Sequence, residues 1–205
     1  MTPPPPPPPP PTMLKANDFA LASAKLECSE AFLHAVVDVE TAGSTGFLSD
    51  GRVEILFESH TFHELTGGKF DTVSPNISTP SWEHNYGAAG SHQWDRLQQA
   101  ISLAGTELAY QAASWGMFQQ MGRGHLTAGF PTARDMVEAY SLSQQAHLFG
   151  FENFVMNNLL VEYMQKLDFT GFALGYNGAA EKENDYDEKL SSAYTKWVGI
   201  LGTSA

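Results

Sequence analysis

The sequence predicts an α+β fold that is mainly α-helical and contains one small β-hairpin. Apolar residues recur every three to four positions over most of the chain after residue 12, which is the period of an amphipathic helix. Between residues 47 and 58 the period changes to two around Asp50-Gly51, a pair that favours tight hairpin turns. Hydrophobic residues make up 42% of the 205 residues, which is enough to bury a sizeable core.

The first twelve residues differ in composition from everything that follows. Residues 3–11 are all proline, and such a run adopts a stiff polyproline II conformation. We therefore predict a proline-rich linker or tail over 1–12 and a single domain over 13–205. Two explanations of the proline run are possible: the chain is a C-terminal domain cut from a longer protein together with its linker, or the run is a tail on which a partner docks. The first is favoured.

Helices are predicted on both sides of the hairpin, and no segment repeats another. Asn17 or Asp18 can cap a first helix that ends near Glu27. Ser29 is a favourable N-cap for a second helix that ends near Thr41. After the hairpin the sequence predicts a long surface loop over 67–90. Six helices are predicted to follow, at about 92–104, 106–115, 132–146, 150–166, 168–176 and 186–198.

The charge and hydropathy of the chain exclude several classes of protein. The formal net charge is −12, which argues against a nucleic-acid-binding protein because those carry a basic face. No apolar run approaches the roughly 18–20 residues that span a bilayer. The first residues also lack the basic and apolar regions of a secretory signal peptide. We therefore expect synthesis in the cytoplasm, with delivery by another system if the substrate lies outside the membrane.

Neither a disulfide framework nor a metal site is expected. Cys28 is the single cysteine and lies among apolar neighbours, which predicts an inert buried thiol. His60 and His63 are three residues apart with Glu64 beside them, but this is not the His-Glu-x-x-His pattern and no third ligand is evident. The sequence predicts no metal and no cofactor.

One carboxyl group emerges from the apolar face of the second predicted helix. Phe32, Val36 and Glu40 follow one another at intervals of four residues and therefore share a face. Burial disfavours the charged form of Glu40, and the helix C-terminus adds partial negative charge, so both effects raise its pKa. A carboxyl group that stays protonated near neutral pH is the general acid that glycoside hydrolysis requires. The alternative is a glutamate at a frayed helix end that points into solvent.

Three motifs then occur in an informative order: ETAG at 40–43, SWGMFQ at 114–119 and YNG at 176–178. Together they resemble the lysozyme-like superfamily of goose-type lysozymes and soluble lytic transglycosylases. More closely, the chain resembles the N-acetylmuramidase domain family of phage endolysins and related bacterial proteins, over about residues 16–198. This resemblance implies a lysozyme-like fold in which the small β-hairpin lies beside the catalytic cleft.

The resemblance also assigns roles to individual residues. It makes Glu40 the catalytic acid. A glycine lets the backbone approach a sugar ring, amides offer donors and acceptors to hydroxyl and acetamido groups, and a tyrosine offers a flat face with a hydroxyl. The substrate-binding residues that it implies are His60, Ser114, Trp115, Gly116, Gln119, Tyr176 and Asn177. For Trp115, packing in the core is the alternative.

Two candidates are available for a second catalytic carboxylate. Asp50 lies at the hairpin turn ten residues after Glu40, and Glu58 ends the returning strand, where His60 could support it. Glu58 is slightly favoured over Asp50, and Glu54 is expected to be a solvated strand residue. Some relatives work with one essential acid, so a partner carboxylate is not required.

The implied reaction is hydrolysis of the β-1,4 bond between N-acetylmuramic acid and N-acetylglucosamine, which lyses bacterial cell walls. The alternatives are a lytic transglycosylase that gives anhydromuramyl products and a non-catalytic glycan-binding module. Peptidoglycan glycan strands are the expected partner, and the periplasm or cell wall is the expected place of action. A phage endolysin and a secreted effector share this domain; the acidic charge and the proline run favour an effector, which would add delivery machinery and an immunity protein as partners.

Overall fold

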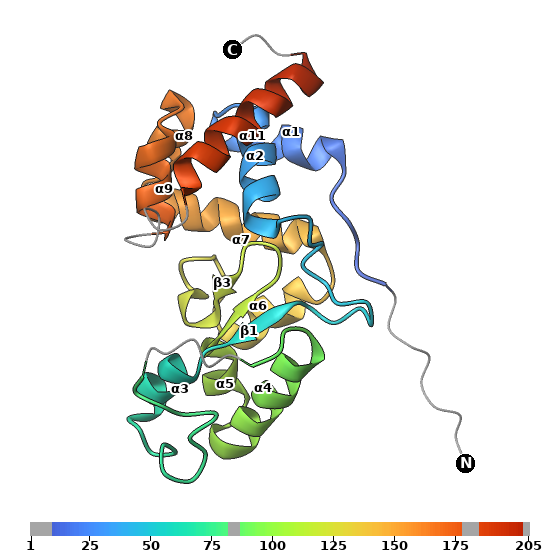
Figure 1. Ribbon diagram of the computed structural model, residues 1–205. Coiled ribbons are helices and arrows are strands. Elements are labelled where there is room, and N and C mark those ends of the chain that lie inside the picture. Colours follow the sequence, from blue (N-terminus) through green and yellow to red (C-terminus); the bar gives the residue numbers. More distant parts are fainter. Residues whose placement is uncertain (1–9, 82–86, 178–184, 203–205) are drawn as a thin grey trace, which may run out of the picture.

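The computed structural model describes residues 10–81, 87–177 and 185–202. Its helices form two groups, drawn in the upper and lower halves of Figure 1. The upper group consists of α1 (Ala16–Leu26), α2 (Glu30–Thr41), α7 (Gln144–Asn157), α8 (Val161–Lys166), α9 (Phe169–Asn177) and α11 (Tyr186–Leu201). The lower group consists of β1 (Ile55–Phe57), α3 (Ser59–Thr66), α4 (Ser91–Ala104), α5 (Thr106–Gln111), β2 (Ala113–Trp115), β3 (Gln120–Met121), η1 (Gly122–Gly124) and α6 (Ala133–Tyr140).

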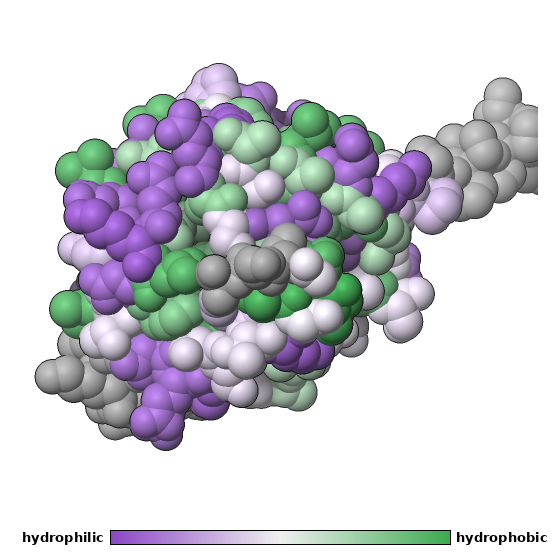
Figure 2. All heavy atoms as spheres, turned by 90° about the horizontal axis from the view of Figure 1, so that it is seen from above, coloured by the Kyte–Doolittle hydropathy of each residue, from purple (hydrophilic) through white to green (hydrophobic). Residues whose placement is uncertain are grey.

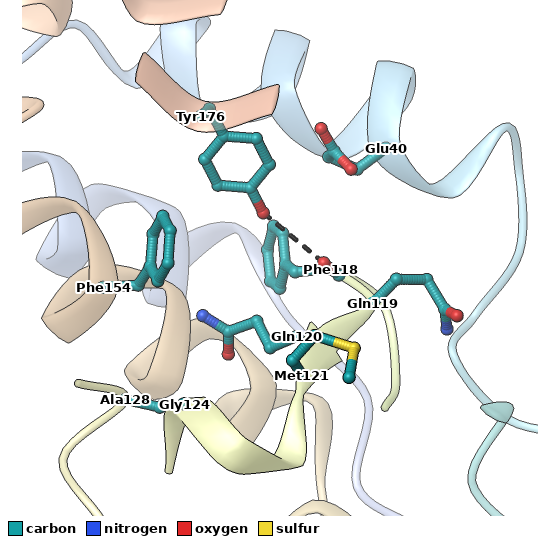
Figure 3. A pocket seen from close by; sticks show the side chains of 9 residues that line it. All are labelled: Glu40, Phe118, Gln119, Gln120, Met121, Gly124, Ala128, Phe154 and Tyr176. Carbon is teal, nitrogen blue, oxygen red and sulfur yellow. Dashed lines mark hydrogen bonds between the residues drawn. The ribbon is translucent and has the colours of Figure 1, made fainter. Parts of the chain in front are cut away.

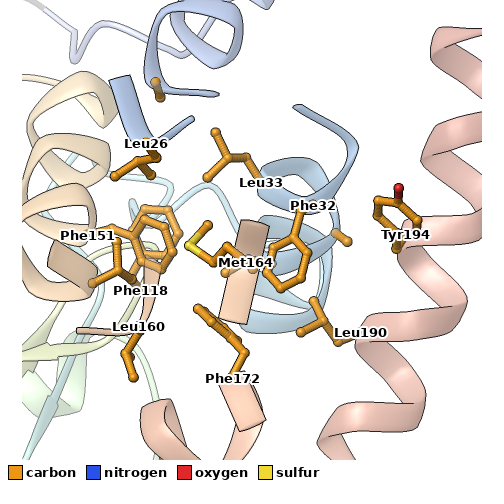
Figure 4. Packing of buried hydrophobic residues seen from close by; sticks show 14 of the residues in the cluster. Leu26, Phe32, Leu33, Phe118, Phe151, Leu160, Met164, Phe172, Leu190 and Tyr194 are labelled. Carbon is orange, nitrogen blue, oxygen red and sulfur yellow. The ribbon is translucent and has the colours of Figure 1, made fainter. Parts of the chain in front are cut away.

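Each group has its own hydrophobic core, and α2 is central to the upper one. Its apolar residues from Ala31 to Val36 are buried, and the helix packs against α1 and α11. Phe32 is fully buried and stacks on Phe169 with ring centroids 5.5 Å apart. The same ring meets Phe172 edge-on at 5.2 Å and lies 6.4 Å from Tyr194 (Figure 4). These contacts fix the axis of α2 and hence the position of its C-terminal end.

The lower group contains a three-stranded antiparallel sheet in the order β1-β2-β3. Ile55 lies opposite Trp115, and Ser114 lies opposite Met121. The predicted hairpin is therefore only partly correct. Its turn forms, with a bridge between Phe47 and Val53, but β1 pairs with β2, which the sequence had suggested to be helical. A short, fully buried apolar strand such as β2 has no alternation that would distinguish it from a helix.

The mainly helical α+β prediction is confirmed, whereas several helix boundaries differ. The segment predicted as one helix over 132–146 breaks before α7, where the Ser143 hydroxyl accepts a hydrogen bond from the Ala146 backbone at 3.1 Å. The helix predicted over 150–166 is interrupted after Asn157, and Leu159 adopts a left-handed conformation there. The first helix begins earlier than expected, with Lys15 in the N-cap position. The further differences are that a short helix not predicted from the sequence, α3, begins directly after the predicted hairpin and that α5 ends at residue 111.

The chain just after the proline run is hydrogen-bonded to the domain. The Thr12 backbone nitrogen donates to Leu142 at 2.9 Å, and its carbonyl oxygen accepts from Gln144 at 2.8 Å. Residue 12, which composition alone assigns to the tail, thus contacts the junction between α6 and α7 in the described structure. The boundary between tail and domain stays a prediction.

Cys28 is partly buried, and burial raises the pKa of its thiol to about 12, so the thiol stays protonated. Over the described ranges, none of the helices combines the length and apolar character that a bilayer crossing requires. Hydrophilic and hydrophobic residues are interspersed on the face seen from above (Figure 2).

Replacing Phe32 by alanine should lower the free energy of unfolding by about 3–5 kcal/mol, because removal of the fully buried ring leaves a cavity among the rings of Phe169, Phe172 and Tyr194. Leu21→Ala is the matched control on α1, where the side chain is 63% exposed, and should change stability by less than about 0.5 kcal/mol. Urea denaturation of both variants measures the difference. Equal losses in the two variants would contradict the role of Phe32 as the anchor of α2.

Candidate active site

Glu40 lies in the last turn of α2 and faces a pocket rather than open solvent (Figure 3). Its side chain is partly buried, and its carboxylate accepts a hydrogen bond from the Tyr186 hydroxyl at the start of α11. Burial is the dominant effect and raises the pKa of Glu40 to about 7, although the hydrogen bond from Tyr186 opposes the shift. Burial therefore keeps this carboxyl group able to donate a proton near neutral pH.

The pocket beside Glu40 has a volume of about 280 Å³. Its walls combine apolar side chains with the amides of two consecutive glutamines, and the only carboxylate among its described lining residues is Glu40. The residues that line it are Glu40, Phe118, Gln119, Gln120, Met121, Gly124, Ala128, Phe154 and Tyr176 (Figure 3). It thus lies between α2, α7 and α9 on one side and the β2–β3 turn with η1 on the other.

The β2–β3 turn brings three of the predicted site residues into one hydrogen-bonded unit. Gly116 has a left-handed φ of 69°, and a side chain there would collide with the His147 ring, whose Cε1 lies 2.7 Å from the position of a Cβ. The Gln119 amide accepts from the Ser114 hydroxyl at 2.9 Å and donates to the Gly116 carbonyl at 2.8 Å. Ser114 is buried and Gln119 is exposed. The serine therefore orients the glutamine, and the glutamine is the residue that a ligand can reach.

The neutral ring of His147 holds the β2–β3 turn in place through two hydrogen bonds. Its Nδ1 accepts from the Met117 backbone at 3.2 Å, so its Nε2 must carry the proton that is donated to the Tyr140 carbonyl at 2.9 Å. Burial lowers the pKa of His147 to about 4, which keeps the ring in this neutral form at physiological pH. The histidine therefore has a structural role in the turn.

Tyr176 forms the opposite wall of the pocket, as the YNG motif predicts. Its hydroxyl donates to the Phe118 carbonyl at 3.4 Å, and its ring stacks on Phe172 at 5.5 Å and meets Phe154 edge-on at 5.4 Å. Burial raises its pKa above the ordinary value, so the hydroxyl remains a donor. Asn177 ends α9, and its side chain lies outside the described part of the structure.

Trp115 lies in the core and not in the site, so its assignment to substrate binding is corrected. The side chain is fully buried, its Nε1 donates to the Tyr110 carbonyl at 2.9 Å, and its ring meets Trp94 edge-on at 5.9 Å. Trp115 occupies a buried strand between two other aromatic residues, so it cannot contact a glycan. Trp115 therefore packs in the core, which was the alternative interpretation of the sequence.

The two carboxylates predicted as partners of Glu40 are both absent from the pocket lining. Asp50 lies on the exposed hairpin turn, where Arg52 binds its carboxylate at 2.6 Å and holds the pKa of that group below its usual range. Glu58 precedes α3 and accepts from the Thr61 hydroxyl at 3.0 Å, with His60 Nε2 3.3 Å away. The predicted contact between His60 and Glu58 exists, but it lies away from the residues that line the pocket with Glu40.

Glu54, which the sequence suggested to be a solvated strand residue, is partly buried and well connected. Its backbone nitrogen donates to the Gly46 carbonyl at 2.8 Å, and its carbonyl accepts from Gly116 at 2.9 Å. Its carboxylate accepts from the Ser44 hydroxyl, and Ser44 in turn bonds the Thr41 carbonyl at the end of α2. Glu54 therefore joins the loop that leaves α2 to the β2–β3 turn.

Two residues of the site were missed at the sequence level. Tyr186 is separated from Glu40 by 146 residues, and only its place in the stretch NDYDEKLSSAY, which resembles the family, pointed to it. Gln120 directly follows the SWGMFQ motif, but nothing in the sequence distinguishes it from a surface glutamine. In the part of the chain that is described, no group of three His, Cys, Asp or Glu residues could hold a metal ion.

Comparisons with known proteins are consistent with this arrangement. The sequence profile of the N-acetylmuramidase family matches residues 29–198. Among solved structures, the crystal structure of the Burkholderia AP3 phage endolysin is similar, with a TM-score of 0.84 and 31% sequence identity, covering 93% of this chain and 73% of that chain. No curated protein gives a significant match. The fold is lysozyme-like, and the chain belongs to the N-acetylmuramidase family of peptidoglycan hydrolases.

Proposed function

We propose that this protein hydrolyses the β-1,4 bond between N-acetylmuramic acid and N-acetylglucosamine, with Glu40 as the general acid. The single observation that carries the proposal is the carboxyl group of Glu40, which lines a sugar-sized pocket and whose pKa is raised by burial to about 7. A general acid is most effective when its pKa lies near the working pH. The family to which the chain belongs supplies the substrate class.

In the proposed reaction, Glu40 donates its proton to the glycosidic oxygen while the bond from that oxygen to the anomeric carbon breaks. Positive charge develops on the sugar ring, and water attacks the anomeric carbon while it gives a proton to the carboxylate that orients it, which leaves a hydroxyl on the new sugar end. Gln119, exposed at the β2–β3 turn, and Tyr176, on the opposite wall, are the residues we assign to binding the glycan. The ring of Tyr176 offers a flat apolar face, and the Gln119 amide offers both a donor and an acceptor.

The attacking water requires orientation, and Glu54 is our first choice for this role. Like Asp50 and Glu58, Glu54 is not among the residues that line the pocket, but its carboxylate is tied through Ser44 to the loop that immediately follows Glu40. The carboxylates of Asp50 and Glu58 are instead engaged by Arg52 and by the pair of His60 and Thr61. We therefore propose Glu54 ahead of Glu58 and Asp50, the two candidates that the sequence favoured.

We place the action of the enzyme in the periplasm or cell wall after delivery by another system. With a formal net charge of −12, the protein has no electrostatic attraction to an anionic wall, so it must find its substrate by shape and hydrogen bonds. An endolysin and a secreted effector with an immunity partner are both compatible with this site. The AP3 protein that it resembles is a phage endolysin.

Glu40→Gln should lower the lytic rate on purified peptidoglycan by about 10²–10⁴-fold, because the amide is nearly isosteric with the acid but cannot donate the catalytic proton. Loss of turbidity of a sacculus suspension measures the rate. Glu138→Gln on the exposed face of α6 is the matched control and should leave the rate unchanged. If Glu40→Gln kept more than about a tenth of the wild-type rate, general acid catalysis by Glu40 would be untenable.

Mass spectrometry of the wild-type products should detect reducing N-acetylmuramic acid ends, because water is the proposed nucleophile. Anhydromuramyl ends would instead mean that the muramyl O6 attacks and that the enzyme is a lytic transglycosylase. Binding of sacculi without any release of sugar would identify a glycan-binding module.

Tyr186→Phe should move the decline of activity at high pH to a higher pH. The Tyr186 hydroxyl stabilises the ionised carboxylate of Glu40, so its removal raises the pKa of Glu40 further and keeps the acid protonated over a wider range. The pH dependence of the initial rate measures the shift. Tyr194→Phe, on the same helix, is the control and should leave the profile in place. A decline that moves to lower pH would contradict the proposed contact.

Glu54→Gln should reduce the hydrolytic rate by at least about tenfold, because the attacking water loses its carboxylate partner. Glu58→Gln and Asp50→Asn should each reduce the rate by less than about threefold, since both carboxylates are engaged away from the pocket. The initial rates of the three variants show which carboxylate matters most, provided that their melting temperatures are similar. A larger loss in Glu58→Gln or Asp50→Asn would return the role to the carboxylates that the sequence favoured.

A further inference from the structure

A buried amide at the floor of the pocket has an unused hydrogen-bond donor. Gln120 on β3 is only 8% exposed and lines the pocket next to Gln119. Its Oε1 accepts from the Tyr140 hydroxyl, but its Nε2 is buried and has no partner among the described residues. Figure 3 shows this nitrogen directed toward the side of the pocket formed by Phe154. A buried donor that is left unsatisfied costs about 1–3 kcal/mol, so such a group calls for an explanation.

The orientation of this amide follows from Tyr140. Burial raises the pKa of Tyr140 far above its ordinary value, so its hydroxyl keeps its proton and needs an acceptor. The acceptor is Gln120 Oε1, and the two groups meet above Gly150 of α7, where any side chain would collide with both. Because Gln120 Oε1 is bound to the Tyr140 hydroxyl, the N–H groups of the amide point away from Tyr140.

The surroundings of Gln120 Nε2 define the kind of group that would accept from it. The adjoining walls are apolar or aromatic and include Phe118, Ala128 and Phe154. A ligand group that accepts from Gln120 and also packs against these walls must carry a small apolar group next to its acceptor oxygen. Glu40 lines the same pocket and the protein has a net charge of −12, so a neutral acceptor is favoured over a carboxylate. An acetamido group has both features, since its carbonyl accepts and its methyl packs against rings.

We propose that Gln120 Nε2 donates a hydrogen bond to the acetamido carbonyl of an N-acetylated amino sugar bound beside Glu40, and that Gln120 thereby makes cleavage depend on N-acetylation of the glycan. The inference rests on the proposed function and adds to it the substituent that the pocket recognises. At about 280 Å³ the pocket is smaller than the roughly 300–1,000 Å³ of drug-sized sites, which suits one substituted sugar rather than several.

Initial rates on sacculi before and after enzymatic N-deacetylation test this dependence. Wild-type protein should prefer the N-acetylated substrate by about tenfold or more, since deacetylation leaves the buried donor unpaired. Gln120→Met, of similar length but without hydrogen-bonding groups, should lower the rate on the acetylated substrate and reduce the preference to about twofold or less. Gln120→Glu keeps an acceptor for Tyr140 but lacks the amide N–H, and it serves as the second variant if the methionine variant is unstable.

Gln145→Met on α7 is the matched control, because Gln145 is another glutamine with a buried amide atom that lacks a partner among the described residues. This variant should keep the wild-type preference. A folded Gln120 variant that also keeps the preference overturns the proposal, and so does a wild-type enzyme that cleaves both substrates equally.

A binding measurement separates failure of this inference from failure of the proposed function. In ¹⁵N-labelled Glu40→Gln protein, the side-chain NH₂ signals of Gln120 are identified by their absence after Gln120→Glu. These signals should shift on titration with tri-N-acetylchitotriose and stay in place with the deacetylated trisaccharide. Signals that ignore the acetylated sugar overturn the inference, even if the enzyme cleaves peptidoglycan. If the signals shift in the Glu40→Gln protein but the wild-type protein releases no sugar from peptidoglycan, recognition of the acetyl group is supported and the hydrolase is refuted.

Discussion

The burial of one carboxyl group at the end of α2 is the constraint on which the rest of the site depends. A glutamate in that position is unfavourable for folding, because the folded state must either protonate it or bury a charge. The structure offsets this cost by two means. The aromatic packing around Phe32 fixes the helix, and the Tyr186 hydroxyl supplies a partner to the carboxylate from the start of α11. The helix is thus held by its apolar face and, toward its C-terminal end, by polar contacts with α11: Tyr186 donates to Glu40, and Lys196 and Trp197 donate to Asp38.

The opposite side of the pocket is held in place largely by buried or hydrogen-bonded groups behind its surface. A neutral His147 bonds the backbone on both sides of it, the glycine at 116 leaves room for its ring, and Ser114 orients Gln119. Glu54 adds backbone bonds to Gly46 and Gly116, so the loop after α2 and the β2–β3 turn are joined through one residue. Because these supports are buried or hydrogen-bonded, the exposed Gln119 is presented by a rigid turn. Rigid support of this kind is what precise placement of a sugar requires.

Local sequence patterns predicted on which face of α2 the Glu40 carboxyl group lies but not its surroundings. The four-residue spacing of Phe32, Val36 and Glu40 is a property of one helix, so periodicity placed Glu40 on the apolar face, with a solvent-facing helix end as the alternative. The pairing of β1 with β2 joins segments about 58 residues apart, and the contact of Tyr186 with Glu40 joins residues 146 apart. No local signal encodes such distances. The three carboxylates between residues 50 and 58 differ in their partners: Arg52 binds Asp50, Thr61 donates to Glu58, and Ser44, ten residues earlier in the chain, donates to Glu54.

The two consecutive glutamines of the β2–β3 turn show how one short segment can serve both positioning and recognition. Gln119 has a left-handed backbone, and its amide is used in both directions within the turn, yet it remains exposed. Gln120 begins the regular strand β3, and its amide is buried with its oxygen committed and its nitrogen unused. The residue that matches the family motif is therefore mostly satisfied by its own turn, and the unmet hydrogen-bonding capacity falls on its neighbour. Since a buried unpaired donor discriminates more sharply between ligands than an exposed amide that water can satisfy, selectivity for a substituent of the sugar is better assigned to Gln120 than to Gln119.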